Sequence, residues 1–383
     1  MALSFDLSEE QEILRKSVRS FAEKEIAPVA RELDEKEEFS LEVTRKMADL
    51  GLFGMFVSPE YGGSGLDYVS YIIAVEEIAR VDGSQAATVA AGNSLGIGPI
   101  YYFGSDEQKK KWLPPLCSGE MLAAFGLTEP NAGSDAGNSK TRAILDGDEW
   151  VINGSKIFIT NASTPITGVI IVQVVTGTRS DGRPELSCIL VPADTKGLEC
   201  CPMHQKMMWR ASNTTEIYFT DCRVPRENLL GQQGHGFHIM LATLDGGRLS
   251  IGAMELGGAQ GAFEKAYRYA HERIQFGRPI FDFQITQFKL ADMALEIELA
   301  RNLLYKACWL RDNRRPFSKE AAMAKLYCSE TMGRVVNQAV QIHGGYGLMK
   351  EYDVERFYRD QKLLDIGEGT SEVQRIVISR LLG

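Results

Sequence analysis

The spacing of apolar residues changes twice along this chain, and that change restricts the folds open to it. Up to about residue 120 the spacing is helical. Ser8 and Gln11 form a capping-box pattern, and Leu14, Val18 and Phe21 follow on one helical face. Further helices are expected over 41–52, 68–80 and 84–111, with a loop at 59–65 where Pro and Gly residues gather.

Short runs of β-type sequence replace the helical pattern between about 121 and 232. Residues 150–157 contain Asn153-Gly154, a pair typical of tight hairpin turns, so two short strands are expected around it. Strands are also expected at 169–175, 188–191 and 216–220. This part of the chain is therefore predicted to be a β-domain.

Helical spacing returns after Gly236 and continues to the end. Two apolar stripes follow Thr286: Leu290, Met293, Ile297 and Leu304 form one, and Phe288, Leu295 and Leu299 form the other. A helix that is apolar on two faces is expected to be buried in a bundle. The prediction is an α+β multidomain protein with a helical domain at 1–120, a β-domain at 121–232 and a helical domain at 233–383.

Composition excludes several classes of function. The net charge of −9 disfavours nucleic acid and anionic membranes as partners. No run of 18 apolar residues occurs, so no membrane span is expected. Seven Cys without a CxxC pair are predicted to be reduced thiols, and Met1 to Leu7 do not have the pattern of a secretory signal. The expected location is the cytoplasm, or the mitochondrial matrix for a processed eukaryotic form.

Common catalytic motifs are absent: there is no GxGxxG after a strand, no GxxxxGK[ST], no HExxH and no serine nucleophile elbow. His235 and His238 stand three residues apart, but ordinary surface or core positions are expected for them and no metal site is predicted. The segment from Phe125 to Asp135 places small and hydroxyl residues after a predicted strand. Such a loop exposes backbone N–H groups that suit a pyrophosphate or the edge of a ring.

Several segments, in order and at the expected separations along the whole chain, together resemble the acyl-CoA dehydrogenase family of the short- and medium-chain type. These segments are Phe125-Gly126-Leu127-Thr128-Glu129-Pro130, Lys156-Ile157-Phe158-Ile159-Thr160-Asn161, Arg273-Ile274-Gln275-Phe276-Gly277-Arg278, Gln341-Ile342-His343-Gly344-Gly345 and Ile366-Gly367-Glu368-Gly369-Thr370-Ser371-Glu372. The resemblance implies an N-terminal helical domain, a central β-barrel-like domain and a C-terminal four-helix bundle. It also implies FAD as cofactor and a homotetramer built as a dimer of dimers.

Positions can be carried over from the family one by one. The flavin and its ribityl chain would lie against Phe125, Leu127, Thr128, Gly133, Ser134, Phe158 and Thr160, with Thr370 and Glu372 contacting the cofactor near a helix start. A neighbouring subunit would hold the pyrophosphate and adenosine end through Arg273, Gln275, Phe276, Gln284, Gln341, Gly344 and Gly345. Relatives often have Trp at the position of Phe158, and Phe keeps the stacking face.

The resemblance also implies the chemistry. Glu368 would remove the α-proton of an acyl-CoA while the β-hydrogen leaves as hydride to flavin N5, and the electrons would pass to electron-transferring flavoprotein. Ser134, Asp245, Arg248 and Gly369 would contact the CoA thioester. Without the resemblance, Asp245 to Arg248 would be interpreted as a helix N-cap with glycines in the first turn, and Glu368 as a solvated loop carboxylate.

The acyl group is less constrained. Relatives often have Tyr at the position of Gly367, and the segment from Ala90 to Gly96 is rich in small residues, so a wider or longer pocket is expected. Medium, branched or cyclic acyl groups would suit it. Met208 stands where relatives often have Gly, with no consequence that the sequence reveals. The alternatives are an acyl-CoA oxidase, disfavoured because such chains are usually longer, and a catalytically silent member of the family.

Overall fold

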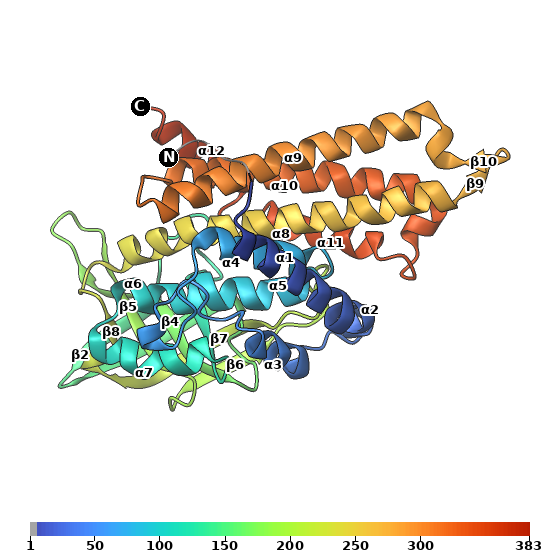
Figure 1. Ribbon diagram of the computed structural model, residues 1–383. Helices are drawn as coiled ribbons and strands as arrows, with labels where there is room; N and C mark the ends of the chain where they lie inside the picture. The colour runs from blue at the N-terminus through green and yellow to red at the C-terminus, as the bar shows by residue number, and fades with distance from the viewer. Residues whose placement is uncertain (1–5) are drawn as a thin grey trace.

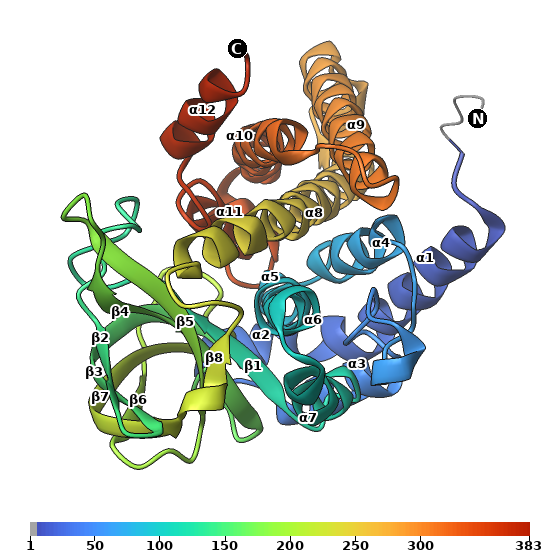
Figure 2. The ribbon, with the colours of Figure 1, turned by 90° about the vertical axis from the view of Figure 1, so that its left-hand side faces the viewer.

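The computed structural model describes residues 6–383. Two units lie side by side beneath a long helical bundle: a group of N-terminal helices and a curved sheet (Figures 1 and 2). Helical, sheet and helical regions follow one another along the chain, as the apolar spacing predicts.

The N-terminal unit is entirely helical. Its elements are α1 (Glu9–Phe21), α2 (Ala27–Lys36), α3 (Leu41–Asp49), α4 (Tyr68–Ala79), α5 (Gly83–Ala90), a π-helical stretch (Ala91–Ile97), α6 (Gly98–Phe103) and α7 (Asp106–Cys117). The capping box is confirmed, since Ser8 and Gln11 exchange side-chain-to-backbone hydrogen bonds. The helical character expected over 84–111 is confirmed and is divided among successive helices, because Gly104 is extended and Ser105 caps a new helix.

The β-domain is one eight-stranded, strongly curved sheet with the order β6-β7-β3-β2-β4-β5-β8, in which β1 pairs in parallel with β4 (Figure 2). The strands are β1 (Leu122–Gly126), β2 (Arg142–Asp146), β3 (Glu149–Thr160), β4 (Thr167–Thr178), β5 (Pro184–Pro192), β6 (Leu198–Pro202), β7 (Thr214–Pro225) and β8 (Leu229–Leu230). The expected strands at 169–175, 188–191 and 216–220 lie within β4, β5 and β7.

The hairpin expected around Asn153-Gly154 is wrong. β3 runs through both residues, and the turn lies at Gly147-Asp148, between β2 and β3. The pairing of β3 with β7 shifts register beside Gly154, where a Cβ would lie 2.6 Å from the Cα of Thr141. Here the Asn-Gly pair marks a bulge where two backbones approach closely.

The C-terminal unit is a bundle around a 37-residue helix, α8 (Gly236–Glu272). The other elements are the two-residue strands β9 (Ile274–Gln275) and β10 (Arg278–Pro279), then α9 (Gln284–Asp312), α10 (Ser318–His343), α11 (Val354–Leu364) and α12 (Ser371–Arg380). α8 packs against α10, α9 and α4 and also reaches the sheet, so it connects all three units (Figure 2).

Only one of the two apolar stripes of α9 is buried. Leu290, Met293, Ile297 and Leu304 are at most 5% exposed, whereas Phe288, Leu295 and Leu299 are at least half exposed. The expectation that both faces are buried is therefore wrong for a single chain. All seven Cys are free thiols, as expected. Within residues 6–383 no helix has the length and apolar character needed to cross a membrane.

Candidate active site

Glu368 lies in the loop between α11 and α12, two residues before the N-cap of α12. Thr370 is that cap: its hydroxyl accepts a hydrogen bond from the amide of Val373. Glu368 has a φ of 52° and Gly369 a φ of 97°, so two consecutive residues are left-handed. A non-glycine residue in this region is uncommon and costs energy, and such strain gathers at functional sites.

The carboxylate of Glu368 points at the glycine at position 247 of α8. A Cβ there would lie 2.1 Å from Oε2 of Glu368 and 3.3 Å from Cδ2 of Leu95, so only glycine leaves room for this carboxylate. Oε2 is buried and has no hydrogen-bond partner. Burial raises the pKa of Glu368 to about 7, although the charges of Lys325 and Arg248 pull it down.

Asp245 and Arg248 lie in the interior of α8, and the charge of Arg248 acts on this carboxylate. The interpretation of this segment as a helix N-cap is wrong, since the helix begins nine residues earlier, at Gly236. Arg248 is buried and pairs with Asp245, which also accepts a hydrogen bond of 2.6 Å from Ser318. The Nε of Arg248 has no partner. A buried cation therefore lies next to the carboxylate of Glu368.

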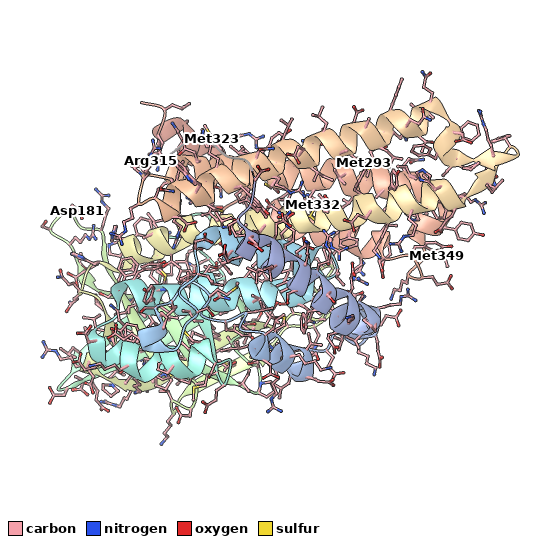
Figure 3. The ribbon with its side chains drawn as sticks, viewed as in Figure 1. Asp181, Met293, Arg315, Met323, Met332 and Met349 are labelled. Atoms are coloured by element: carbon pink, nitrogen blue, oxygen red, sulfur yellow. The ribbon has the colours of Figure 1, made fainter. Side chains whose placement is uncertain are left out.

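A surface hollow of about 470 Å³ lies where α8 begins. It is lined by Arg179, Gly234, His235, Phe237, His238 and Leu241. Asp181, at the tip of the β4–β5 hairpin, and Arg315, between α9 and α10, lie at this same end of the molecule (Figure 3). Ser134 is exposed in the loop after β1, which approaches the hollow because Gly137 lies close to the ring of Phe237. Leu241, Asp245 and Arg248 share one face of α8, which leads from the hollow to Glu368.

The predicted flavin residues of the β-domain come together from two strands. The loop after β1 lies along β3, since the amide of Ile157 donates to the carbonyl of Thr128 at 2.9 Å and Lys156 donates to the carbonyl of Leu127 at 3.1 Å. Phe125 is a core side chain, whereas Gly133 is exposed with no neighbour where its Cβ would be.

Phe158 is the exposed aromatic face of this region. Its φ is 61° and the pairing of β3 with β7 shifts register around it, so it forms a bulge. Its ring is 62% exposed, and Thr160 follows two residues later on the same strand. Bulges near active sites redirect a side chain, and here the bulge presents a ring to solvent.

Other predicted cofactor residues belong to β9, β10 and the adjoining helix ends, and β9 and β10 lie at the opposite end of the bundle from α12, the helix that follows Glu368 (Figure 1). Arg273 caps α8 and stacks over Tyr346, and Phe276, at the tip between β9 and β10, is 93% exposed. Gln284 begins α9, and Gln341 is exposed near the end of α10. Gly344 and Gly345 have open space where their Cβ atoms would be. One chain does not bring these residues to its own Glu368.

The glycines predicted to widen the acyl pocket differ in the space that they leave. Gly92 and Gly96 add no free volume, because Phe53 and Ala123 fill the positions of their Cβ atoms. At Gly367 a Cβ would meet only ordinary contacts with Leu363, so the backbone does not require glycine there. Met208 is partly buried against the core. Of these three glycines, only Gly367 leaves space that a wider pocket could use.

Two features of this region gave no signal in the sequence. The hollow at the start of α8 is formed by residues from separate elements. Lys325 of α10 is fully buried behind the Glu368 loop, and a lysine in a helix is usually a surface residue.

Family comparisons cover almost the whole chain. Models of the N-terminal, middle and C-terminal domains of acyl-CoA dehydrogenases match residues 8–120, 124–222 and 234–383. A probable acyl-CoA dehydrogenase of Bacillus subtilis is 55% identical over 99% of this chain and 100% of its own. The short-chain-specific acyl-CoA dehydrogenase of Clostridium acetobutylicum is 47% identical over 98% of this chain and 99% of its own.

Solved structures agree. Butyryl-CoA dehydrogenase from Megasphaera elsdenii superposes with a TM-score of 0.96 at 43% identity, covering 99% of this chain and all of its own. A chain in a study of the electron-transferring flavoprotein of Acidaminococcus fermentans gives 0.96 at 44% identity and covers 99% of both chains.

Two more distant structures carry further information. An acyl-CoA dehydrogenase from Bacillus anthracis, solved with FAD, has a TM-score of 0.93 at 37% identity and covers 98% of this chain and 68% of its own. A prolyl acyl carrier protein oxidase has 0.94 at 33% identity and covers 99% of this chain and 100% of its own. The matched domain models and the full-length relatives show that this chain belongs to the acyl-CoA dehydrogenase family of oxidoreductases.

Proposed function

We propose that this protein is an FAD-dependent dehydrogenase that introduces an α,β double bond into short or branched acyl-CoA thioesters, with Glu368 as the base. The observation that carries the proposal is the carboxylate of Glu368. Its Oε2 is buried, has no hydrogen-bond partner within residues 6–383, and faces the glycine at position 247 of α8. A carboxylate stabilised by several donors would be a poor base, whereas this one is held ready to accept a proton.

The pKa of about 7 suits the proposed reaction. The α-proton next to a thioester is weakly acidic, and its removal leaves negative charge on the carbonyl oxygen. A base with a pKa near the working pH is ionised in part and still binds the proton well. Exclusion of water by the acyl chain would raise the basicity of Glu368 further.

A donor for the negative charge that develops on the thioester oxygen is available next to the proposed base. Among residues 6–383, no acceptor is found for the amide N–H of Glu368. This free N–H supports its proposed role in binding the thioester oxygen. Arg248 lies next to the carboxylate and keeps the local charge balanced.

The residues present fit a flavin. Phe158 offers an exposed ring, and Thr160 offers a hydroxyl on the same strand. Gly133 has open space where its Cβ would be, so a ligand can approach the backbone closely there. When bound, FAD supplies the acceptor for the β-hydrogen. We propose that Phe125, Leu127, Thr128, Gly133, Ser134, Phe158, Thr160, Thr370 and Glu372 form its site in one subunit.

A second subunit would complete that site. The residues that it would contribute lie around β9, β10 and the adjoining helix ends, at the opposite end of the bundle from α12, and several of them are exposed. They are Arg273, Gln275, Phe276, Gln284, Gln341, Gly344 and Gly345. The exposed stripe of α9, formed by Phe288, Leu295 and Leu299, offers an apolar surface for such an assembly. We propose a homotetramer, built as a dimer of dimers.

The substrate would enter at the hollow beside α8. Arg179, His235 and His238 offer cationic or donor groups for the phosphates of CoA, and Ser134, Asp245 and Arg248 would follow along the pantetheine arm towards Gly369 and Glu368. Acyl groups that branch near Cα and Cβ would be accepted because position 367 has no side chain.

Electron-transferring flavoprotein is the proposed acceptor, in line with the similar chain from the Acidaminococcus fermentans study. An oxidase is the second candidate. The similar prolyl acyl carrier protein oxidase is matched along its whole length, so chain length does not separate the two.

Anaerobic titration of the purified, FAD-loaded protein with butyryl-, hexanoyl-, octanoyl- and isovaleryl-CoA tests this function. Loss of the flavin absorbance with at least one of these thioesters is expected. Reoxidation that is slow in air but fast with electron-transferring flavoprotein identifies a dehydrogenase, and fast reoxidation in air identifies an oxidase. A flavin that none of the thioesters bleaches would contradict the proposal.

A further inference from the structure

Lys325 lies behind the loop that carries Glu368. Its side chain is fully buried on α10. Its ammonium donates to the carbonyl of Leu364 at 2.5 Å and to the carbonyl of Gly369 at 3.1 Å. The first carbonyl ends α11 and the second belongs to the residue directly after Glu368. One buried ammonium thus holds the backbone of the loop on both sides of the proposed base.

Gln374 of α12 also binds the backbone of the loop that carries Glu368. Its amide donates to the carbonyl of Gly369 at 2.9 Å and to that of Glu368 at 3.3 Å. Because Glu368 has a left-handed φ, the loop needs such outside support to keep a strained conformation.

Lys325 also acts on the charge of the base. Glu255 and Arg248 of α8, and Asp365 and Glu368 of the loop, all face it, and burial lowers the pKa of its ammonium. Its positive charge is the first of the two that lower the pKa of Glu368. The same group therefore fixes the backbone and favours the ionised carboxylate.

Glu255 of α8 is the second carboxylate on which the charge of Lys325 acts. It is fully buried and neither of its carboxyl oxygens has a hydrogen-bond partner. Burial raises its pKa well above the usual range, against the pull of Lys325. An ionised carboxylate without a donor is costly in this position, so burial favours the neutral acid form of Glu255. A neutral Glu255 leaves the charge of Lys325 free to act on Glu368.

We propose that Lys325 is the positioning residue of the catalytic loop and that Glu255 is kept neutral so that Lys325 stays charged towards Glu368. The inference rests on the proposed role of Glu368 as the base. It assigns to Glu255 of α8 and Lys325 of α10 control over the pH at which the base is ionised.

Stopped-flow bleaching by butyryl-CoA between pH 6 and pH 9 tests the proposal, with FAD content measured for each variant. Lys325→Gln keeps N–H donors but removes the charge. The midpoint of the rise in its bleaching rate with pH is expected to move up by about one pH unit, and its plateau rate should stay within about threefold of wild type. Lys325→Met removes the donors too, so its plateau rate should also fall about tenfold or more. Glu255→Gln should keep the wild-type midpoint.

Lys206 provides the matched control. It is a partly buried lysine whose pKa is also lowered by burial, and it donates to the carbonyl of Ser212 and the hydroxyl of Thr214, in the β-domain. Lys206→Met should leave the midpoint unchanged. A wild-type midpoint in Lys325→Gln would overturn the proposal, and so would a midpoint lowered by Glu255→Gln, because that would show an ionised Glu255. Normal bleaching by Glu368→Gln would instead refute the proposed base.

Discussion

Two carboxylates in different regions of this molecule, one buried and one with a single buried oxygen, are used in opposite ways. In the β-domain, Glu129 supports the loop after β1: it accepts hydrogen bonds from Ser139, Lys140, Thr141 and Lys156. Burial alone would raise its pKa, but the charge of Lys156 and these donors lower the pKa to about 2. In the bundle, Glu368 has no donor on Oε2, and burial raises its pKa to about 7.

The difference shows that partners, more than burial, decide what a buried carboxylate does. Glu129 and Lys156 satisfy each other, and all three donors of Lys156 are used, by Leu127, Glu129 and Ser139. Such a pair holds a loop in place. Glu368 is held only through its backbone, which leaves its side chain free for a proton.

The largest expected effect is on the reactive carboxylate. Glu368→Gln should retain FAD but bleach with butyryl-CoA at least about a thousandfold more slowly, since a general base contributes up to about 10⁴ in rate. Stopped-flow absorbance measures it. Glu330→Gln, which changes an exposed carboxylate paired with Arg375 on α12, should bleach at the wild-type rate. A similar loss in both variants would show that the effect is not specific to the base.

On the supporting carboxylate, the expected effect is on stability. Lys156→Met leaves Glu129 buried without its cation, and breaking a buried pair costs about 3–5 kcal/mol. The urea midpoint of unfolding should fall and FAD should be lost more easily. Lys36→Met breaks an exposed pair with Glu32 and should cost under about 1 kcal/mol. Equal losses in the two variants would remove the distinction drawn between buried and exposed pairs.

The two carboxylates should also differ in how stability depends on pH. The folded pKa of Glu368 is raised above its ordinary value of 4.5, so its contribution to stability is complete below that value and is lost as pH rises through about 7. Glu368→Gln should therefore gain stability over wild type between pH 6 and pH 9, by up to about 3 kcal/mol. Glu129 has a lowered pKa, so its contribution is present above 4.5 and is lost only as pH falls through about 2. Thermal unfolding of wild type and Glu368→Gln between pH 6 and pH 9 measures this difference. Stability curves of the two proteins that stay parallel across that pH range would contradict the prediction.

A smaller effect is expected from the space beside the base. Gly367→Tyr places a ring where the backbone tolerates a side chain. Relative to butyryl-CoA, bleaching by isovaleryl-CoA should fall about tenfold, since a pocket discriminates by about 1–3 kcal/mol per methylene-sized change. An unchanged ratio of the two rates would show that position 367 does not border the acyl group.

Much of this arrangement can be predicted from sequence because it depends on local patterns. The order of the three regions follows from apolar spacing, and the family segments locate Glu368 and the glycines around it. The bulge at Asn153-Gly154 could not be predicted, because a close approach of Thr141 overrides the usual turn. The exposed stripe of α9 has the same composition as the buried one, so its exposure depends on which helices lie nearby.

The charge interactions around Glu368 could not be predicted from the sequence, because they also depend on which helices pack together. Glu255 and Lys325 are 70 positions apart in the sequence, and only the packing of α8 on α10 brings them together. Gly92 and Gly96 were interpreted as space for substrate, but Phe53 and Ala123 fill that space. A pattern shows which residues are small, and the fold determines what occupies the volume they leave.

The central claim is that the side chain of Glu368 takes the proton. The most direct measurement is the single-turnover rate of flavin bleaching by butyryl-CoA as a function of pH, with FAD saturating and substrate well below saturation. The account predicts a rate that rises through a midpoint near pH 7 in wild type and is almost absent in Glu368→Gln at every pH. A wild-type rate that stays constant from pH 5.5 to 8.5, or a Glu368→Gln variant that reproduces the wild-type curve, would contradict it.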